Sequence, residues 1–178
     1  MLKYQQAFTL VEMAIVLSIM TIVLAMAVPA AQSYFNSSRL SSAGMQLRND
    51  LGQARNEAIK RNSRVLICPR NAAGTDCSAT ANWQAGWVIC SDLDANDACD
   101  ASTAANPNPL VIRGALSTSL ALSNTSAANA TTPIHFNANG TQGTLGGTTV
   151  LLTLSGIWDN APAAKIFSIA STGSVSTP

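Results

Sequence analysis

The chain has 178 residues and a formal net charge of +1, and only 11% of its residues are charged. A nearly neutral chain has no overall electrostatic attraction to nucleic acid. The length suits one domain with one modest hydrophobic core.

An apolar segment of membrane length lies near the N-terminus. As a helix rising about 1.5 Å per residue, Phe8–Val28 would span about 30 Å, the thickness of a bilayer's hydrocarbon core. Lys3 precedes it, which favours a cytoplasmic N-terminus. Its only charged residue is Glu12, and an unpaired carboxylate in a membrane costs on the order of 3 kcal/mol. Such a residue usually pairs with another group or marks a functional site.

Three interpretations of this segment compete. The first is a permanent single-span anchor with Glu12 near the interface, and the second is a secretory signal peptide cut at Ala25-Met26-Ala27. The third is a short leader cut after Ala7, which leaves the apolar helix on the mature protein. A signal peptide would not explain Phe8–Glu12 and would discard a helix whose pattern continues past the cut, so we favour the third.

Residues Ala7–Glu12 (AFTLVE) resemble the processing site of type IV pilins and type II secretion pseudopilins. The resemblance implies that a prepilin peptidase cuts before Phe8 and methylates the new amine, giving N-methylphenylalanine. It also implies that Glu12 pairs with the terminal amine of a neighbouring subunit. Ala7 stands where the family usually has glycine, and because alanine is also small we expect normal or slower cleavage.

The helical pattern continues beyond Pro29, at a position where the family commonly has a helix-bending proline. Because proline lacks a backbone donor, we expect a kink or local opening near Leu24–Ala25. The sequence predicts one long helix, with residues 8–29 in the membrane or filament core and residues 30–62 amphipathic. Its apolar face recurs every three or four residues, at Leu40, Ala43, Leu47, Leu51, Ala54 and Ala58.

From Ser63 onward the pattern changes to short strands rich in apolar and β-branched residues. Their spacing suits antiparallel sheets in a β-rich head over residues 63–178. We expect a loop or hairpin turn within Asn137–Gly147. The predicted strands are Arg64–Pro69, Ala85–Ser91, Pro109–Arg113, Ser119–Leu122, Pro133–Asn137, Thr148–Leu154 and Lys165–Ala170.

Charge is distributed unevenly along the head. Basic residues dominate between Arg39 and Arg70, whereas Asp76–Asp100 contains aspartates and no basic residue. The simpler interpretation is a solvated helix face and an acidic loop. The alternative is a pair of complementary surfaces between stacked subunits, whose attraction would be sensitive to salt.

Four cysteines, Cys68, Cys77, Cys90 and Cys99, form two sequential pairs with the same separation. If the head lies outside the cytoplasm, disulfides are expected. Of three possible connectivities we favour Cys68–Cys77 with Cys90–Cys99, and Cys68–Cys90 is the main rival. Zinc is disfavoured, because no Cys-x-x-Cys occurs and the only histidine, His135, is distant in sequence.

Several motifs of the head resemble the GspH/FimT group of minor pilins. This resemblance covers nearly the whole chain and implies an α+β pilin fold, in which the long N-terminal helix packs on an antiparallel β-sandwich-like head. The matching motifs are Ile67–Arg70, Trp83, Gly86–Ile89, Asp92–Asp97, Leu110–Arg113, Ile134–Asn137 with Gly140, and Ile169–Gly173.

The acidic segment offers the main candidate for a metal site. Asp92, Asp94, Asn96 and Asp97 place oxygen ligands at intervals, as calcium loops do, but the glycine and glutamate of an EF-hand are missing. We favour a structural turn, because Asp and Asn bond their own backbone there. We find no nucleophile motif beside His135 and no phosphate-binding loop, so we expect neither an enzyme nor a cofactor nor a small-molecule substrate.

Some FimT members take up DNA, and the resemblance implies that they use a C-terminal Gly-Arg-x-Arg tail. The matching positions here are Gly173–Ser176 (GSVS), which lack both arginines, and the group's late cysteine pair is also missing. DNA binding is therefore disfavoured. If it occurs, the better candidates are Arg55, Lys60, Arg61 and Arg64.

The favoured function is that of a minor pilin in the tip or initiating complex of a type IV pilus. The expected partners are major and minor pilins, the prepilin peptidase and, before assembly, the inner membrane, with the head in the periplasm. The final location would be a surface pilus or a periplasmic pseudopilus. The alternatives are a type II secretion minor pseudopilin, a DNA-uptake receptor and a signal-cleaved secreted binding domain.

Overall fold

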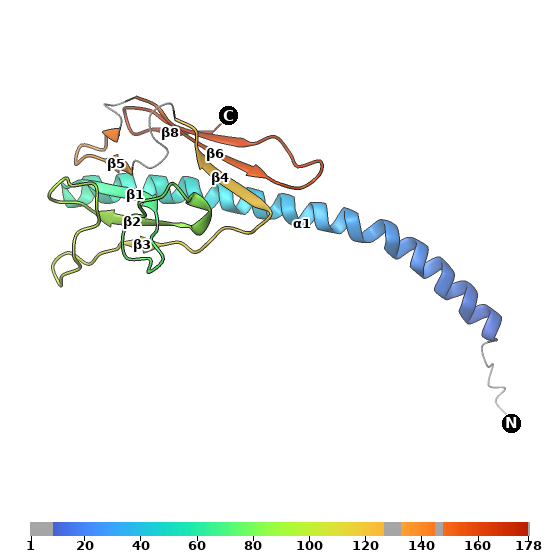
Figure 1. Ribbon diagram of the computed structural model, residues 1–178. Coiled ribbons are helices and arrows are strands. Elements are labelled where there is room, and N and C mark those ends of the chain that lie inside the picture. The colour runs from blue at the N-terminus through green and yellow to red at the C-terminus, as the bar shows by residue number, and fades with distance from the viewer. Residues whose placement is uncertain (1–8, 127–132, 145–147, 178) are drawn as a thin grey trace, which may run out of the picture. The chain divides into compact units, whose positions relative to one another are not determined.

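The computed structural model describes residues 9–126, 133–144 and 148–177. They contain one long helix, α1 (Leu10–Arg61), the 3-10 turn η1 (Trp83–Ala85) and short strands (Figure 1). Contacts within the chain divide it after Asn36 into two compact units. We call residues 9–36 the stalk and the described residues from Ser37 onward the head.

The helix α1 has 52 residues and changes character between the two units. In the stalk its apolar side chains are exposed, and the helix is long and apolar enough there to cross a membrane. In the head it buries the predicted apolar face, with Leu47, Leu51 and Ala54 fully inaccessible to solvent. The helix α1 continues through Pro29 without interruption. The kink or local opening expected near Leu24–Ala25 stays a prediction.

The helix ends close to the predicted boundary at residue 62. Asn62 adopts a left-handed conformation, with φ of 50°, and its N–H and that of Ser63 bond the carbonyls of Ile59 and Ala58. These bonds satisfy carbonyls that the last turn would otherwise leave unpaired. Lys60 and Arg61 place positive charge at the negative end of the helix dipole.

The first sheet has the strand order β3-β2-β1-β5 and is antiparallel throughout. In its central pair, β1 and β2, every residue is buried because both faces are covered. The strands are β1 (Val65–Pro69), β2 (Trp87–Ser91), β3 (Val111–Ile112) and β5 (Ile134–Phe136).

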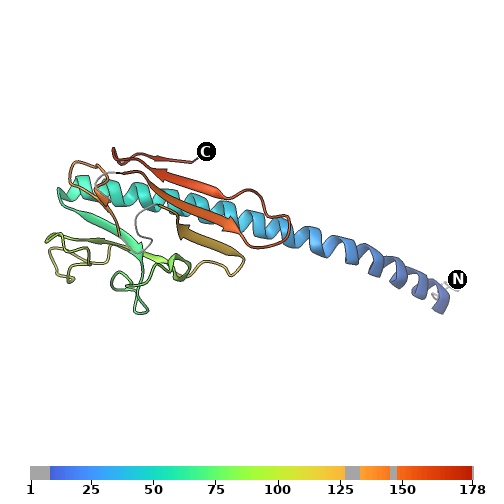
Figure 2. The same ribbon diagram turned by 45° about the horizontal axis from the view of Figure 1, so that its top comes forward.

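The second sheet has the order β4-β6-β7-β8 and is also antiparallel (Figure 2). Alternate residues of β6 are buried, which is typical of a sheet with one face on a core. The strands are β4 (Leu120–Asn124), β6 (Val150–Gly156), β7 (Lys165–Ile169) and β8 (Val175–Ser176).

Both sheets and the head part of α1 share one hydrophobic core. Its largest fully buried side chains include Trp83, Trp87, Phe136 and Phe167. Each contributes roughly 1.5–3 kcal/mol or more by its burial. The α+β architecture and the antiparallel sheets confirm the prediction, and each of the seven predicted strands corresponds to one of β1–β7.

The segment after β5 was predicted as a loop or hairpin turn. Asn137 and Gly140 form a tight turn, in which the N–H of Gly140 bonds the carbonyl of Asn137, and Phe136 bridges Gln142. The strands β5 and β6 lie in different sheets, so the segment connects sheets and is not a hairpin between paired strands. Residues 145–147 of this segment lie outside the described part of the chain.

Candidate functional site

The stalk exposes a continuous apolar surface. From Leu10 to Val28 its large side chains are half or more exposed, far beyond the scattered apolar residues that monomeric proteins normally show. Its first turn contains Glu12, whose backbone N–H bonds the Thr9 hydroxyl at 3.2 Å. The Glu12 carboxylate has no partner among the described residues. Ala7 and Phe8, the predicted processing residues, lie outside the described part of the chain.

The head part of α1 contains a second carboxylate, Asp50, which is only 1% exposed. Arg113, just after β3, donates to both of its oxygens, with Nε–Oδ2 of 2.8 Å and Nη2–Oδ1 of 2.7 Å. The Trp87 indole on β2 donates to Oδ2 at 2.9 Å. The bond to Asp50 raises the pKa of Arg113. Helix and first sheet are thus joined by a satisfied, buried ion pair.

Sequence reasoning missed this arrangement. It treated the charged residues of the helix as a solvated face or as a surface between subunits, and it assigned no partner to Asp50. The signal was present, because Asp50 lies three residues from Leu47 and one from Leu51, on the face predicted to be buried. A carboxylate on such a face requires a partner, and Arg113 follows a predicted strand.

A second charged cluster lies where α1 leads into β1. Arg64 is 3.2 Å from Asp92 (Nε–Oδ2), forms an ion pair with Asp97 and faces the Nδ1 of His135 at 3.2 Å. Because a guanidinium only donates, Nδ1 of His135 is the acceptor and its imidazole is neutral. Burial and the nearby Arg64 charge lower the pKa of His135 to about 4. His135 is thus a partly buried member of a hydrogen-bonded network, in which the Thr144 hydroxyl lies 3.4 Å from its Nδ1.

The predicted metal candidates form a turn held by backbone bonds. The two oxygens of Asp92 accept the N–H groups of Asn96 at 3.0 Å and of Asp97 at 3.2 Å, and Asp94 accepts the Asn96 side chain at 2.9 Å. Carboxylate oxygens of Asp92, Asp94 and Asp100 come within 4.8 Å of one another. Burial raises the pKa of Asp92 although Asn96 and Arg64 oppose it. These bonds hold the segment in a turn.

The four residues named for DNA binding are mostly engaged within the head. Arg55 donates to the carbonyls of Gly140 at 2.9 Å and Thr172 at 3.1 Å, and so joins α1 to a loop of each sheet. Arg61 bonds Glu57 at 2.8 Å and Asn106 at 3.1 Å, and the hydrogen bond from Arg61 lowers the pKa of Glu57. Arg64 belongs to the cluster described above. Lys60 is the most open of the four, with its side chain 77% exposed beside Glu57.

The disulfides join Cys68 to Cys77 and Cys90 to Cys99, which is the pairing favoured from the sequence. Each fixes a polar loop to a central strand of the first sheet. Asp76 links the two loops, because its Oδ1 accepts the N–H groups of both Cys77 and Cys99. With every cysteine oxidised, the sulfur atoms that lie close together are not metal ligands.

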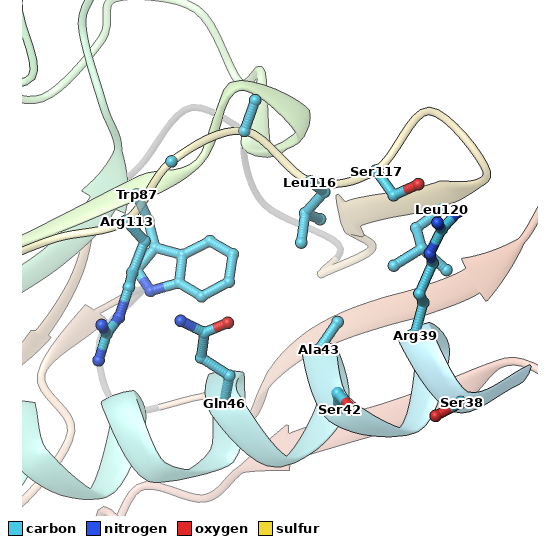
Figure 3. A pocket seen from close by; sticks show the side chains of 12 residues that line it. Ser38, Arg39, Ser42, Ala43, Gln46, Trp87, Arg113, Leu116, Ser117 and Leu120 are labelled. Atoms are coloured by element: carbon cyan, nitrogen blue, oxygen red, sulfur yellow. The ribbon is translucent and has the colours of Figure 1, made fainter. Parts of the chain in front are cut away.

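A groove of about 400 Å³ lies between α1 and the segment that leads into β4. Arg39 rises from α1 at one end of the groove, and Trp87, Arg113 and Gln46 lie at the other (Figure 3). We call it the α1 groove. Its lining residues are Ser38, Arg39, Ser42, Ala43, Gln46, Trp87, Arg113, Gly114, Ala115, Leu116, Ser117 and Leu120.

A long helix with an exposed apolar N-terminal half, whose other half packs on two antiparallel sheets, defines the class of pilin-like subunits. The prokaryotic N-terminal methylation motif matches residues 2–28, and the family described as Type II transport protein GspH matches residues 43–173. The chain therefore belongs to the GspH family.

Solved structures support the same fold. Two crystal forms of the type IV minor pilin FimU from Pseudomonas aeruginosa are similar to this chain, each at 20% sequence identity. One has a TM-score of 0.58 and covers 82% of this chain and 92% of FimU. The other has a TM-score of 0.54 and covers 78% and 91%. No curated protein matches the chain.

Proposed function

We propose that the protein is a minor pilin of a type IV pilus, matured by cleavage between Ala7 and Phe8. The observation that carries the proposal is the stalk, an exposed apolar helix with a single carboxylate near its start and a folded head on its continuation. A soluble monomer has no use for such a surface, whereas a subunit that moves from a bilayer into a helical bundle needs it in both places. The role is structural and requires no catalytic group.

The position of Glu12 supports assembly through its charge. In a bilayer or a filament core an unpaired carboxylate costs on the order of 3 kcal/mol, and an amine from another subunit would offset that cost. Cleavage before Phe8 would create such an amine. Before assembly the stalk would lie in the inner membrane with the head in the periplasm, and afterwards the head would pack near the pilus tip or in the initiating complex.

The second candidate is a minor pseudopilin of a type II secretion system. The description of the matching family as a type II transport protein favours it. Both candidates use the same stalk, the same processing and the same kind of partner, so they differ in the filament that the subunit joins. A DNA-uptake receptor is the weaker alternative, because Arg55, Arg61 and Arg64 are bonded within the head and the Gly173–Ser176 tail has no arginine.

Two measurements test the proposal: the identity of the first residue of the mature chain, and the effect of removing the Glu12 charge on incorporation into filaments. Mass spectrometry of the membrane-held protein should find N-methylated Phe8 as the first residue, and a chain that starts at Val28 would refute the proposal. Glu12→Gln removes the charge and keeps the shape, so it should give a cleaved, membrane-held subunit that is at least about tenfold depleted from filaments. Ser18→Ala, which loses only a hydroxyl bonded to its own helix at Ala14, is the matched control.

Deletion of this subunit in the cell distinguishes the two candidate filaments. Loss of the subunit from a type IV system should reduce sheared surface pili and leave protein secretion unchanged. The opposite pattern would identify the protein as a pseudopilin and contradict the pilus assignment.

A further inference from the structure

The α1 groove combines a free cation with an apolar wall. Arg39 is exposed and has no hydrogen bond or ion pair with any described residue, and no aspartate or glutamate lines the groove. Arg113, the other cation there, is already paired with Asp50. The partly exposed Leu116 and the exposed Ala115 supply apolar surface beside these groups, whereas Leu120 is only 2% exposed and belongs to the core (Figure 3). A fitting ligand therefore offers one carboxylate next to one apolar group.

The same chain displays that combination in the loop after β2. Leu93 is 63% exposed, and it is followed by the exposed Asp94, whose carboxylate also accepts the Asn96 side chain at 2.9 Å. The loop is held in place by bonds from Leu93 N–H to Asp100 at 2.8 Å and from Asn96 N–H to Asp92 at 3.0 Å. Little conformational entropy would be lost when such a preformed loop binds. We call Leu93 and Asp94 the acidic tip.

The groove and the acidic tip lie at opposite ends of the head. The tip belongs to the loop that Arg64, just past the end of α1, holds through the carbonyl of Ala95 and the carboxylate of Asp97 (Figure 1). The groove lies along Ser38–Gln46, about six turns earlier, or roughly 30 Å along the helix. The tip of one molecule cannot reach its own groove, so a contact between them joins two molecules.

We propose that the acidic tip of one subunit docks in the α1 groove of a second copy of this chain, with Asp94 pairing with Arg39 and Leu93 packing against Leu116 and Ala115. This inference rests on the proposed function, because a head-to-tail contact builds an open filament when its rotation does not close into a ring. The negative charge of Asp94 complements the positive charge of Arg39. The apolar lining of the groove favours a ligand that also offers an apolar side chain such as Leu93.

The experiment uses the purified full chain in detergent micelles. A photoreactive amino acid replaces Leu93 in one variant and the groove residue Ser42 in a second, and cross-linked dimers are mapped by mass spectrometry. We expect the first to link to groove peptides and the second to residues 92–97 of another copy. A photoreactive residue at Asn49, exposed on α1 outside the groove, controls for association through the apolar stalk.

Charge reversal tests the pairing itself. Arg39→Glu and Asp94→Arg should each lower the yield of cross-linked dimer from the Ser42 position about fivefold, and the double variant should restore most of it. Leu93→Ala should lower the same yield about tenfold. Arg48→Glu and Asp159→Arg reverse exposed charges outside the contact and should leave the yield unchanged.

Two results would overturn the inference: links confined to the stalk or distributed as from Asn49, and single reversals that behave like the two control reversals. If the groove links only to a different pilin-like protein added to the micelles, the occupant is that protein and the second copy is refuted. The assay needs neither leader cleavage nor a filament, so its failure is distinguishable from failure of the proposed function.

Discussion

Arg113→Ala tests how much folding stability is lost when the buried carboxylate of Asp50 loses its ion-pair partner. The variant removes both guanidinium bonds and leaves Asp50, 1% exposed, with the Trp87 indole as its remaining partner. Breaking a buried ion pair on one side costs about 3–5 kcal/mol. Because the Arg113 side chain is 35% exposed, water can enter the vacated space, and we expect the lower end, about 3 kcal/mol.

For a domain of this size that loss corresponds to a fall of roughly 10 °C in Tm. The assay is thermal unfolding of the full chain in detergent, followed by near-ultraviolet circular dichroism in the tryptophan region, because Trp83, Trp87 and Trp158 all lie in the head. Arg48→Ala, an exposed arginine on the same helix, should change the free energy of unfolding by less than about 0.5 kcal/mol.

A double variant separates loss of the pair from loss of packing. Asp50→Leu with Arg113→Met removes both charges and keeps side-chain volume, so it should recover most of the stability that Arg113→Ala loses. If Arg113→Ala costs less than about 1 kcal/mol, or if the double variant is the less stable of the two, the reasoning is refuted.

Further predictions concern the head. Gly173→Ala should destabilise the head by at least about 2 kcal/mol in the same assay, because Gly173 has a φ of +76° and a Cβ there would meet the carbonyl of Gly140. As a control, Gly52→Ala should be neutral or slightly stabilising, because no atom lies within 4 Å of the added Cβ. Replacing Cys68 and Cys77 together by alanine should cost about 2–3 kcal/mol in urea unfolding, and no loss would show that the disulfide is dispensable. The pKa of His135 is about 4 in the folded chain and ordinarily 6.5, so between these pH values the unfolded chain binds more protons and the free energy of unfolding falls as the pH drops from 6.5 towards 4. His135→Gln should reduce that loss of stability by up to about 3 kcal/mol. Identical curves of stability against pH for the variant and the natural chain would contradict this prediction.

The strands were predictable because their patterns are local. The apolar and β-branched runs Val65–Ile67 and Val150–Leu154 each indicate a strand and its approximate position without reference to the rest of the chain. The strand β8 was not predictable, because Val175–Ser176 has only two residues and exists through pairing with Ser168 and Ile169 at the sheet edge. Assignment of strands to two separate sheets was also beyond the sequence, since β5 and β6 follow one another without pairing.

The candidate site divides in the same way. The stalk and the cysteine pairs follow from composition and spacing, which act over short stretches. The partners of Arg55 and Arg64 do not, because they come from residues far away in the sequence, such as Gly140, Ala95 and His135. Most of the basic side chains that the sequence offered to an anionic partner are bonded to carbonyl and carboxylate groups of the head itself.

The helix α1 shows how one element can serve both folding and assembly. It contains Asp50, on the buried apolar face of the head, and Glu12, in the apolar N-terminal segment, and both environments penalise an unpaired charge. The partners of Asp50, Trp87 and Arg113, come from the same chain, so its burial is compensated when the head folds. Glu12 has no such partner among the described residues, so on the proposed function its compensation must come from another subunit. Where the partner originates thus decides whether a buried carboxylate stabilises a fold or selects a neighbour.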